Sequence, residues 1–357
     1  MRSCRVNEMD WGYINARMRG MKSRLLNKRA LDTLVLQPDL ASLIAELEKT
    51  PYRDEIIEAK VRYSGVLCVE YALRKNFTRT FQKILKFVRE PEAERYIRIF
   101  LHRWDVQNIK TILRGKNIHI PAEEIQDCLV PAGELDEATL TELVRQPDVR
   151  AVIDLLATWQ VVYARPLTES YPTFAKSGDL SLLECALNEF YYADALEQVK
   201  PLSYNNGLIR NILALEIDVV NLRTVLRMIR DQVAPGEAKK FLISGGKEFD
   251  QEGLDHLITL HSIEEVVEEL KTTPYRFLAD IPPPAMRTQK ISVIEKQLEK
   301  FLVQKGVGAF TGDPLSVASV IGYFWAKYNE ITNIRIISRC KTADFTVEQL
   351  KEELIYV

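Results

Sequence analysis

The sequence has few of the residues with which proteins bind metals or form covalent intermediates. Only five cysteines and four histidines occur among 357 residues. The cysteines are Cys4, Cys68, Cys128, Cys185 and Cys340. Their wide spacing, without a CxxC pair, is typical of a reducing compartment and not of a disulfide scaffold or a zinc site. The two closest histidines, His256 and His261, would lie on well-separated faces of a helix. The sequence therefore predicts no metal site.

The motifs of the common enzyme classes are also missing. There is no GxxxxGK[ST] phosphate loop, no GxGxxG after a strand, no HExxH and no GxSxG. Aromatic runs such as FYYADAL (190–196) and YFWAKY (323–328) are more typical of helix packing than of a cofactor site. We therefore expect no catalytic residues and no cofactor.

The chain lacks an excess of charge and a long apolar run. Its net charge is −2, whereas a nucleic-acid-binding protein is usually basic. The longest mostly apolar stretch, 315–325, is about half of the ~20 residues that cross a bilayer. The first ten residues, MRSCRVNEMD, have no apolar core of a signal peptide. We expect a soluble protein, or one held at a membrane by a partner.

One helical segment is present three times. It reads WDVQNIKTILR at 104–114, IDVVNLRTVLR at 217–227 and NEITNIRIISR at 329–339. The central asparagines, Asn108, Asn221 and Asn333, are 113 and 112 residues apart. A repeat of this length is the size of a domain, whereas solenoid repeats are about 20–50 residues long.

Other pieces recur in the same order around this helix. LVLQPDLASLIAEL (34–47) matches LVRQPDVRAVIDLL (143–156) and, more loosely, LITLHSIEEVVEEL (257–270). TPYR occurs at 50–53 and 273–276, with VYARP at 162–166. Upstream of each asparagine helix stands a glutamate, at Glu70, Glu184 and Glu295. Conserved order and spacing predict three similar helical domains, at 1–120, 121–235 and 236–357.

The two ends of the chain carry incomplete copies. YINARMRGMK (13–22) resembles a degenerate asparagine helix, and it is followed directly by the first QPD segment. The tail DFTVEQLKEEL (344–354) resembles LDEATLTELV (135–144). We infer that the chain begins and ends partway through a period.

Helical patterns cover almost the whole sequence, so we predict an all-α fold. Three pairs of long helices are expected, at 66–89 with 91–116, 181–199 with 206–231, and 289–304 with 314–340. Asp313-Pro314 is interpreted as an N-cap followed by proline at the first helical position. Prolines and glycines gather in segments such as VPAGE and ISGGKE, which are predicted loops.

The repeated helix has two distinct faces. An aliphatic face contains the asparagine, which we interpret as a buried amide that fixes the register of this helix against a partner helix. The opposite face carries two cations one turn apart. These cations are Lys110, Arg114, Arg223, Arg227, Arg335 and Arg339. They either form a solvated face, pair with glutamates on neighbouring helices, or meet an acidic partner.

The ordered set of repeats resembles the C subunit of archaeal and bacterial A/V-type ATP synthases, which corresponds to the d subunit of eukaryotic V-ATPases. The resemblance rests on the tripled N-[IL]-[KR]-x-[IV]-x-R helix, on Y-x-N-A-R-x-R-x-M at 13–21 and on L-x-x-Q-P-D. It spans roughly residues 10 to 355 and departs from the pattern at LHS (260–262).

The resemblance implies a funnel of three helical domains around a pseudo-three-fold axis. It also implies a non-catalytic rotor subunit of the central stalk, which binds no nucleotide and couples the central axle to the membrane proteolipid ring. Ion translocation and ATP synthesis or hydrolysis would thereby be linked. The protein would lie peripherally at the cytoplasmic face of the membrane, touching the membrane only through the ring. The sequence leaves the alternative of a free-standing helical-repeat scaffold that binds protein partners.

Overall fold

The structure, a computed structural model, describes residues 11–281, 291–343 and 345–357. Helices make up 74% of it, and no described residue lies in a strand. The all-α prediction is therefore confirmed. Cys4 and the rest of the first ten residues, for which the sequence predicts no signal peptide, lie outside the described residues.

The chain forms two compact units. The first unit joins the two ends of the sequence, Met1–Ala164 and Gly306–Val357, and the second is Arg165–Lys305. The three-domain division at 1–120, 121–235 and 236–357 stays a prediction.

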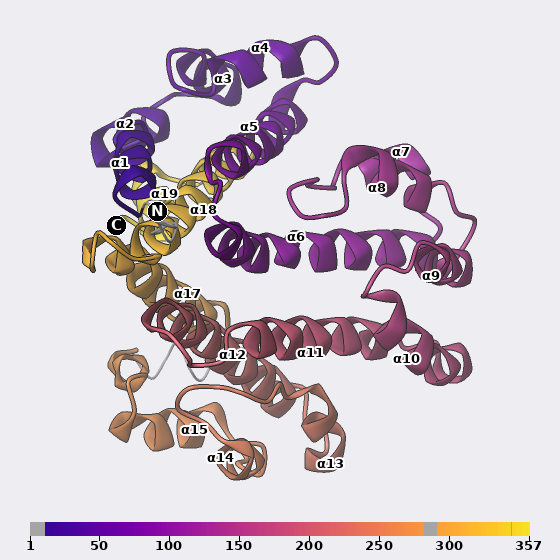
Figure 1. Cartoon of the computed structure of the whole chain (residues 1–357). Coiled ribbons are helices and arrows are strands. Elements are labelled where there is room, and N and C mark those ends of the chain that lie inside the picture. Colours follow the sequence, from indigo (N-terminus) through magenta and orange to yellow (C-terminus); the bar gives the residue numbers. More distant parts are fainter. Residues whose placement is uncertain (1–10, 282–290, 344) are drawn as a thin grey trace, which may run out of the picture. The chain divides into compact units, whose positions relative to one another are not determined.

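The first unit contains most of the helices. They are α1 (Trp11–Lys22), α2 (Lys28–Val35), α3 (Leu40–Leu47), α4 (Arg53–Lys60), α5 (Gly65–Phe87), α6 (Pro91–Asn117), α7 (Ala122–Gln126), α8 (Glu137–Val144), α9 (Val149–Thr158), η4 (Ala309–Thr311), α18 (Ala318–Cys340) and α19 (Val347–Glu353). N-terminal α1 and α2 pack against C-terminal α18, so indigo and yellow segments lie side by side in Figure 1. Phe324 of α18 contacts the rings of Phe81, Phe100 and Trp104 at centroid distances of 5.5, 5.1 and 5.7 Å.

The second unit is built from helices of the middle of the chain. Its elements are α10 (Ala164–Ser177), α11 (Ser181–Gln198), α12 (Tyr204–Arg230), α13 (Pro235–Ala238), η1 (Lys239–Phe241), α14 (Gln251–Leu257), α15 (Ile263–Glu269), η2 (Leu270–Thr272), η3 (Arg276–Asp280) and α17 (Ile291–Gly308). Helix α10 begins one residue before Arg165, and helix α17 ends three residues after Lys305. Long α12 packs against α11 and α15, which bury its aliphatic face.

The three pairs of long helices occur where the sequence predicts them, as α5 with α6, α11 with α12 and α17 with α18. Pro91 stands at the start of α6, where its missing N–H costs nothing. The predicted start of α18 is wrong, because this helix begins at Ala318. Asp313 instead closes a turn before the helix. Its side chain accepts the N–H of Leu315 at 2.8 Å, and its carbonyl accepts the Ser316 hydroxyl.

The QPD segments recur because each begins a helix in the same way. Asp39 accepts the N–H of Ser42 and thereby caps α3, and Asp148 accepts the N–H of Ala151 and caps α9. In the divergent third copy, Ser262 occupies the cap position of α15. Serine and aspartate cap about equally well. The substitution of QPD by LHS therefore preserves the local structure.

The TPYR segments form matched turns that bury a tyrosine. The N–H of Tyr52 donates to the Thr50 hydroxyl at 3.2 Å, and the N–H of Tyr275 donates to the Thr273 hydroxyl at 3.1 Å. Each threonine hydroxyl also donates to the carbonyl three residues earlier. Both tyrosines are fully buried, and each points its hydroxyl at an acidic residue described below.

Candidate functional site

The three repeated asparagines make the same pair of hydrogen bonds. Each side-chain amide donates to a backbone carbonyl and accepts the N–H of that same residue, which lies 22 positions later. The pairs are Asn108–Val130 (2.7 and 2.8 Å), Asn221–Ile243 (2.7 and 2.8 Å) and Asn333–Ile355 (2.9 and 3.1 Å). The asparagine side chain thus pairs with the backbone of one residue, as a neighbouring strand would. This residue lies in the segment that follows the asparagine helix, which we call the connector. The predicted role in helix register stays a prediction, and the bonded partner is this connector backbone.

The distance from the asparagine to the next helix is the same in all three repeats. It shows that the C-terminal tail corresponds to a different element of the other repeats from the one that its sequence suggests. Helices α7, α13 and α19 each begin 14 residues after the asparagine of their repeat. Helix α19 therefore corresponds to α7 and α13, and the predicted match between 344–354 and 135–144 is wrong. Residues 135–144 follow the bonded connector residue, whereas α19 precedes it.

Helix α1 is not a fourth copy of the asparagine helix, so that prediction is also wrong. Asn15 donates to the carbonyl of Pro314 at 2.8 Å and accepts from the side chain of Arg19 on its own helix. Neither bond runs to a residue 22 positions later. Helix α1 is an additional element that packs on α18.

A buried carboxylate lies three residues before each asparagine. The two oxygens of Asp105 accept the N–H groups of Glu134 and Leu135 at 2.9 Å. Asp218 accepts those of Lys247 and Glu248 at 3.0 and 2.9 Å. Both carboxylates therefore hold the connector at a second point, 29 and 30 residues further along the chain.

Glycine is required where the connector passes these carboxylates. A Cβ atom at Gly133 would lie 2.1 Å from Asp105, and one at Gly246 would lie 2.2 Å from Asp218. Such distances are far inside van der Waals contact. The glycines of VPAGE and ISGGKE, interpreted above only as loop residues, were the sequence signal for these two carboxylate sites.

Burial changes the acidity of both aspartates. Desolvation raises the pKa of Asp105 to about 6 and that of Asp218 to about 6. The backbone N–H bonds oppose this shift because they favour the ionised form. Both carboxylates consequently change charge near neutral pH.

The third carboxylate is held by the N-terminal part of the chain. Glu330 accepts the N–H of Leu26 on one oxygen and the Tyr52 hydroxyl on the other, at 2.6 Å for the latter. Tyr275 makes the corresponding bond to Asp218 at 3.1 Å. Burial raises the pKa of both tyrosines, so their hydroxyls remain donors. These contacts join helix α18 to the N-terminal segment of the chain.

A buried ion pair is added in this third repeat. Lys327 lies 2.8 Å from Glu330 and donates to the Tyr52 hydroxyl at 2.9 Å. Both charged residues are nearly inaccessible, with 4% exposure each. Sequence analysis placed Lys327 in an aromatic packing run and missed its role, because a lysine between an alanine and a tyrosine gives no sign of its partner.

Four of the six repeated cations form ion pairs within their own unit. Arg335 and Arg339 both bind Glu70, each at 2.8 Å. Arg223 binds Glu299 at 3.2 Å, and Arg227 binds Glu295 at 2.6 Å. These contacts join an asparagine helix to the long helix that carries the repeated glutamate. They favour local pairing among the alternatives open at the sequence level. Lys110 is buried, and neither it nor Arg114 is without a partner.

The described residues bring together no cluster of metal ligands, and none of their helices is long and apolar enough to cross a membrane. What the geometry defines is a class of all-α protein built on three matched asparagine–carboxylate helices. The chain matches the ATP synthase (C/AC39) subunit family over residues 14–353 and belongs to it.

Named relatives agree with this membership. The C subunit of the A-type ATP synthase of Methanosarcina mazei is 30% identical over 354 residues, which cover 98% of this chain and 93% of that protein. The corresponding protein of Methanococcoides burtonii is 30% identical over 97% of this chain and 94% of its own length. That of Archaeoglobus fulgidus is 28% identical, over 98% and 97% respectively.

Proposed function

We propose that this chain is the non-catalytic central-stalk subunit of an A/V-type rotary ATP synthase. It joins the central axle to the membrane proteolipid ring and so couples ion translocation to ATP synthesis or hydrolysis. The observation that carries the proposal is the family match, which extends over residues 14–353, together with relatives that share 30% identity along nearly the whole chain. On this proposal the protein lies peripherally at the cytoplasmic face of the membrane and touches it only through the ring.

The repeated network supports a mechanical role. Each asparagine helix is tied to its connector by buried hydrogen bonds, which are strong in a low-dielectric interior and costly to leave unmade. A part that transmits torque needs such stiffness, and close-packed helices supply it. Three matched repeats fit the proposed arrangement of three domains around a pseudo-three-fold axis.

Loss of coupling is the test of this proposal. Membranes that contain the assembled synthase are compared with membranes from cells lacking this chain, with ATP hydrolysis and ATP-driven ion pumping measured on the same preparation. We expect pumping to be lost without the chain and restored when the wild-type chain is supplied. Hydrolysis by the head should persist, because the chain supplies no catalytic group. Pumping that continues undiminished without the chain would overturn the proposal.

A complementary measurement uses the purified chain. We expect it neither to bind nor to hydrolyse ATP. Stoichiometric micromolar nucleotide binding in equilibrium dialysis would contradict a purely mechanical role.

A further inference from the structure

The three asparagine helices share a further matched position, three residues before the buried carboxylate. It holds Lys327 in the third repeat, Leu215 in the second and His102 in the first. Lys327 forms the buried ion pair with Glu330, and Leu215 is apolar. Histidine is the side chain that ordinarily changes charge between about pH 5 and 8. The first repeat thus carries a titratable group where the third carries an ion pair and the second carries none.

The imidazole of His102 faces the connector of its own repeat. Its Nε2 lies 3.3 Å from a carboxylate oxygen of Glu134, and only 16% of the His102 side chain is exposed. This nitrogen is buried and makes no hydrogen bond, so the contact depends on charge and not on an aligned N–H. A neutral imidazole gains little from a carboxylate placed in this way, whereas an imidazolium forms an ion pair with it.

Helix α6 therefore meets Glu134 at two points. Asp105 accepts the backbone N–H of Glu134 at 2.9 Å, and His102 approaches its side chain. His102 and Asp105 are three residues apart, so they are neighbours on the surface of the helix. Burial raises the pKa of Asp105 to about 6, and a positive charge on His102 acts against this rise. The two groups consequently compete for protons next to one connector residue.

Glu134 is the only carboxylate in the described part of the chain that pairs with His102. On α6 itself, Arg98 pairs with Glu94 at 2.6 Å, and Arg103 lies over the Trp104 ring. On α5 and α18, Lys75 binds Glu58 and Lys327 binds Glu330.

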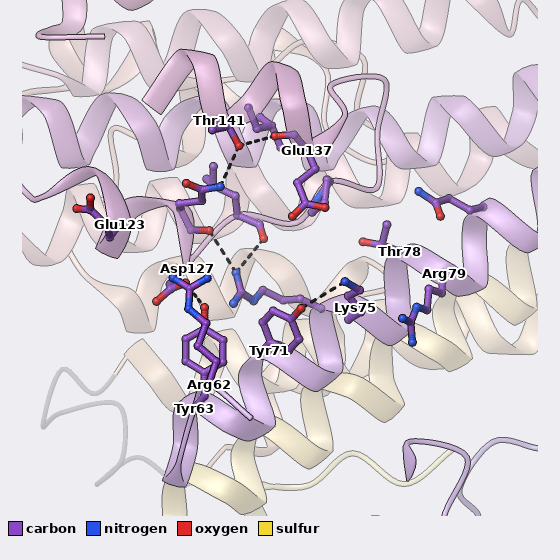
Figure 2. Close-up of a pocket in the computed structure, with 16 residues that line it drawn as sticks. Arg62, Tyr63, Tyr71, Lys75, Thr78, Arg79, Glu123, Asp127, Glu137 and Thr141 are labelled. Atoms are coloured by element: carbon purple, nitrogen blue, oxygen red, sulfur yellow. Dashed lines mark hydrogen bonds between the residues drawn. The ribbon is translucent and has the colours of Figure 1, made fainter. Parts of the chain in front are cut away.

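The short helices α7, α8 and α9 also pack on α6. Glu123 of α7 and Glu137 of α8 line a cavity that they share with α5 (Figure 2). The other charged residues of these three helices are exposed, and they are Glu124, Glu142, Arg145, Arg150 and Asp154. The charge of His102 is therefore balanced mainly by Glu134 and Asp105.

We propose that His102 and Glu134 form a proton-dependent clasp on the connector of the first repeat. In acid, the imidazolium of His102 binds the Glu134 carboxylate and adds an ion pair to the N–H bonds of Asp105. In base, the imidazole loses its proton to solvent, and Glu134 is held by Asp105 alone. The other repeats lack this device, because Leu215 takes up no proton and Lys327 binds Glu330. The clasp lies within this chain, so the inference goes beyond the proposed function and does not depend on it.

NMR of the histidine imidazoles in the full-length chain tests whether His102 takes up the proton. Its signal is assigned as the one that disappears in His102→Leu, which installs the residue of the second repeat. We expect this signal to titrate between about pH 5 and 8. Glu134→Gln removes the counter-charge and should lower the midpoint by roughly half a pH unit or more.

A double-mutant cycle of His102→Leu and Glu134→Gln separates the ion pair from the titration of Asp105. Urea unfolding followed by tryptophan fluorescence gives the coupling of the two residues. This coupling should change the unfolding equilibrium constant about fivefold at pH 5.5 and less than about twofold at pH 8.5. His102→Lys supplies a fixed charge and should keep its coupling to Glu134 at both pH values.

The ion pair of Lys75 with Glu58, at 2.8 Å, is the matched control in the same unit. Their contact raises the pKa of Lys75 and lowers that of Glu58, so the coupling of this pair should be equal at both pH values. Three results would overturn the proposal. They are a His102–Glu134 coupling that is also equal at both pH values, a His102 signal that does not titrate in this range, and a midpoint that Glu134→Gln leaves unchanged.

Discussion

The repeat in the second unit and the third repeat, in the first unit, both use an asparagine and a carboxylate to hold neighbouring segments. The segments that they hold are connected differently along the chain. In the second unit, Asp218 and Asn221 hold a connector that follows them in the same continuous chain. In the first unit, Asn333 holds Ile355 near the C-terminus, whereas Glu330 holds Leu26 near the N-terminus. The network is therefore defined by geometry and does not require chain continuity.

The difference between the two repeats is a buried charge. Lys327 lies beside Glu330 and Tyr52, and together they join α18 to the N-terminal segment. The continuous repeat also has a tyrosine on Asp218, but Leu215 stands where the third repeat has Lys327, six residues before the asparagine. A buried ion pair adds little net stability, but it strongly penalises any arrangement that separates the partners. Such a pair would suit a junction that covalent continuity does not enforce.

Removal of Glu330 is expected to have the largest effect. Glu330→Ala leaves Lys327 buried without a counter-charge, which costs about 3–5 kcal/mol. Asp218→Ala removes an acceptor but strands no cation, and should cost about 1–3 kcal/mol. Differential scanning calorimetry, which follows the unfolding of both units, compares the two variants. Tryptophan fluorescence in urea follows Glu330→Ala alone, because all four tryptophans lie in the first unit and Asp218 lies in the second.

A double variant is the control for this comparison. Lys327→Met combined with Glu330→Gln removes both charges and should be clearly more stable than Glu330→Ala alone. If Glu330→Ala and Asp218→Ala cost the same, the buried pair has no special role in the split repeat.

The second effect concerns pH. The pKa of Asp105 in the folded state, about 6, is above the ordinary value of about 3.9. The folded state thus binds the proton more tightly than the unfolded state. The contribution of Asp105 to the free energy of unfolding is therefore fully present below about pH 4 and is lost as pH rises through 6. The shift corresponds to about 3 kcal/mol.

Asp105→Asn isolates this effect because asparagine does not titrate in this range. The free energy of unfolding of the wild type minus that of the variant should fall by about 2–3 kcal/mol between pH 4 and pH 7. Urea titrations at both pH values, followed by tryptophan fluorescence, measure it. A difference that stays constant over this range would show that the carboxylate is ionised throughout.

The third effect compares two asparagines. Asn221→Ala leaves both the N–H and the carbonyl of Ile243 without their side-chain partner, at a cost of about 1–3 kcal/mol. Asn333→Ala should cost less, since Asn329 also donates to the carbonyl of Ile355 at 2.8 Å. Differential scanning calorimetry of the two variants compares the effects. A larger loss for Asn333→Ala would contradict the assigned role of Asn329.

The sequence predicted much of this architecture, because three copies of the long-helix pairs and of the QPD and TPYR segments were visible in it. It did not show that Asn108 bonds to a connector, since one residue 22 positions away carries no distinctive side chain. It matched α19 to the wrong segment, because short amphipathic helices have similar sequences at different places in a repeat. The Lys327–Glu330–Tyr52 cluster joins residues 275 positions apart and required the structure.

The smallest effect on stability is expected from the repeated arginines. Arg339 and Arg227 are mostly exposed and should each contribute about 0.2–1 kcal/mol through their ion pairs. The alternative that these cations also meet an acidic partner predicts a different loss. Changing Arg114, Arg227 and Arg339 together to alanine should leave the melting temperature nearly intact while assembly becomes more sensitive to salt.

The exposed arginines Arg53, Arg145 and Arg276 provide a matched control triple. Both triples are compared by thermal melting and by a pull-down of axle and ring proteins across a salt series. Unchanged assembly with a large drop in melting temperature would show that the repeated arginines only stabilise the fold of this chain.

Amide hydrogen exchange at single-residue resolution tests the central structural claim most directly. The hydrogen-bond network predicts that the N–H groups of Val130, Ile243 and Ile355 exchange slowly and to a similar extent, although Ile355 stands close to the last residue of the chain. It also predicts protection of the Leu26 N–H, which Glu330 accepts. Exchange of Ile355 and Leu26 at the rate of an unstructured chain, beside a protected Ile243, would contradict the claim that both ends complete the third repeat.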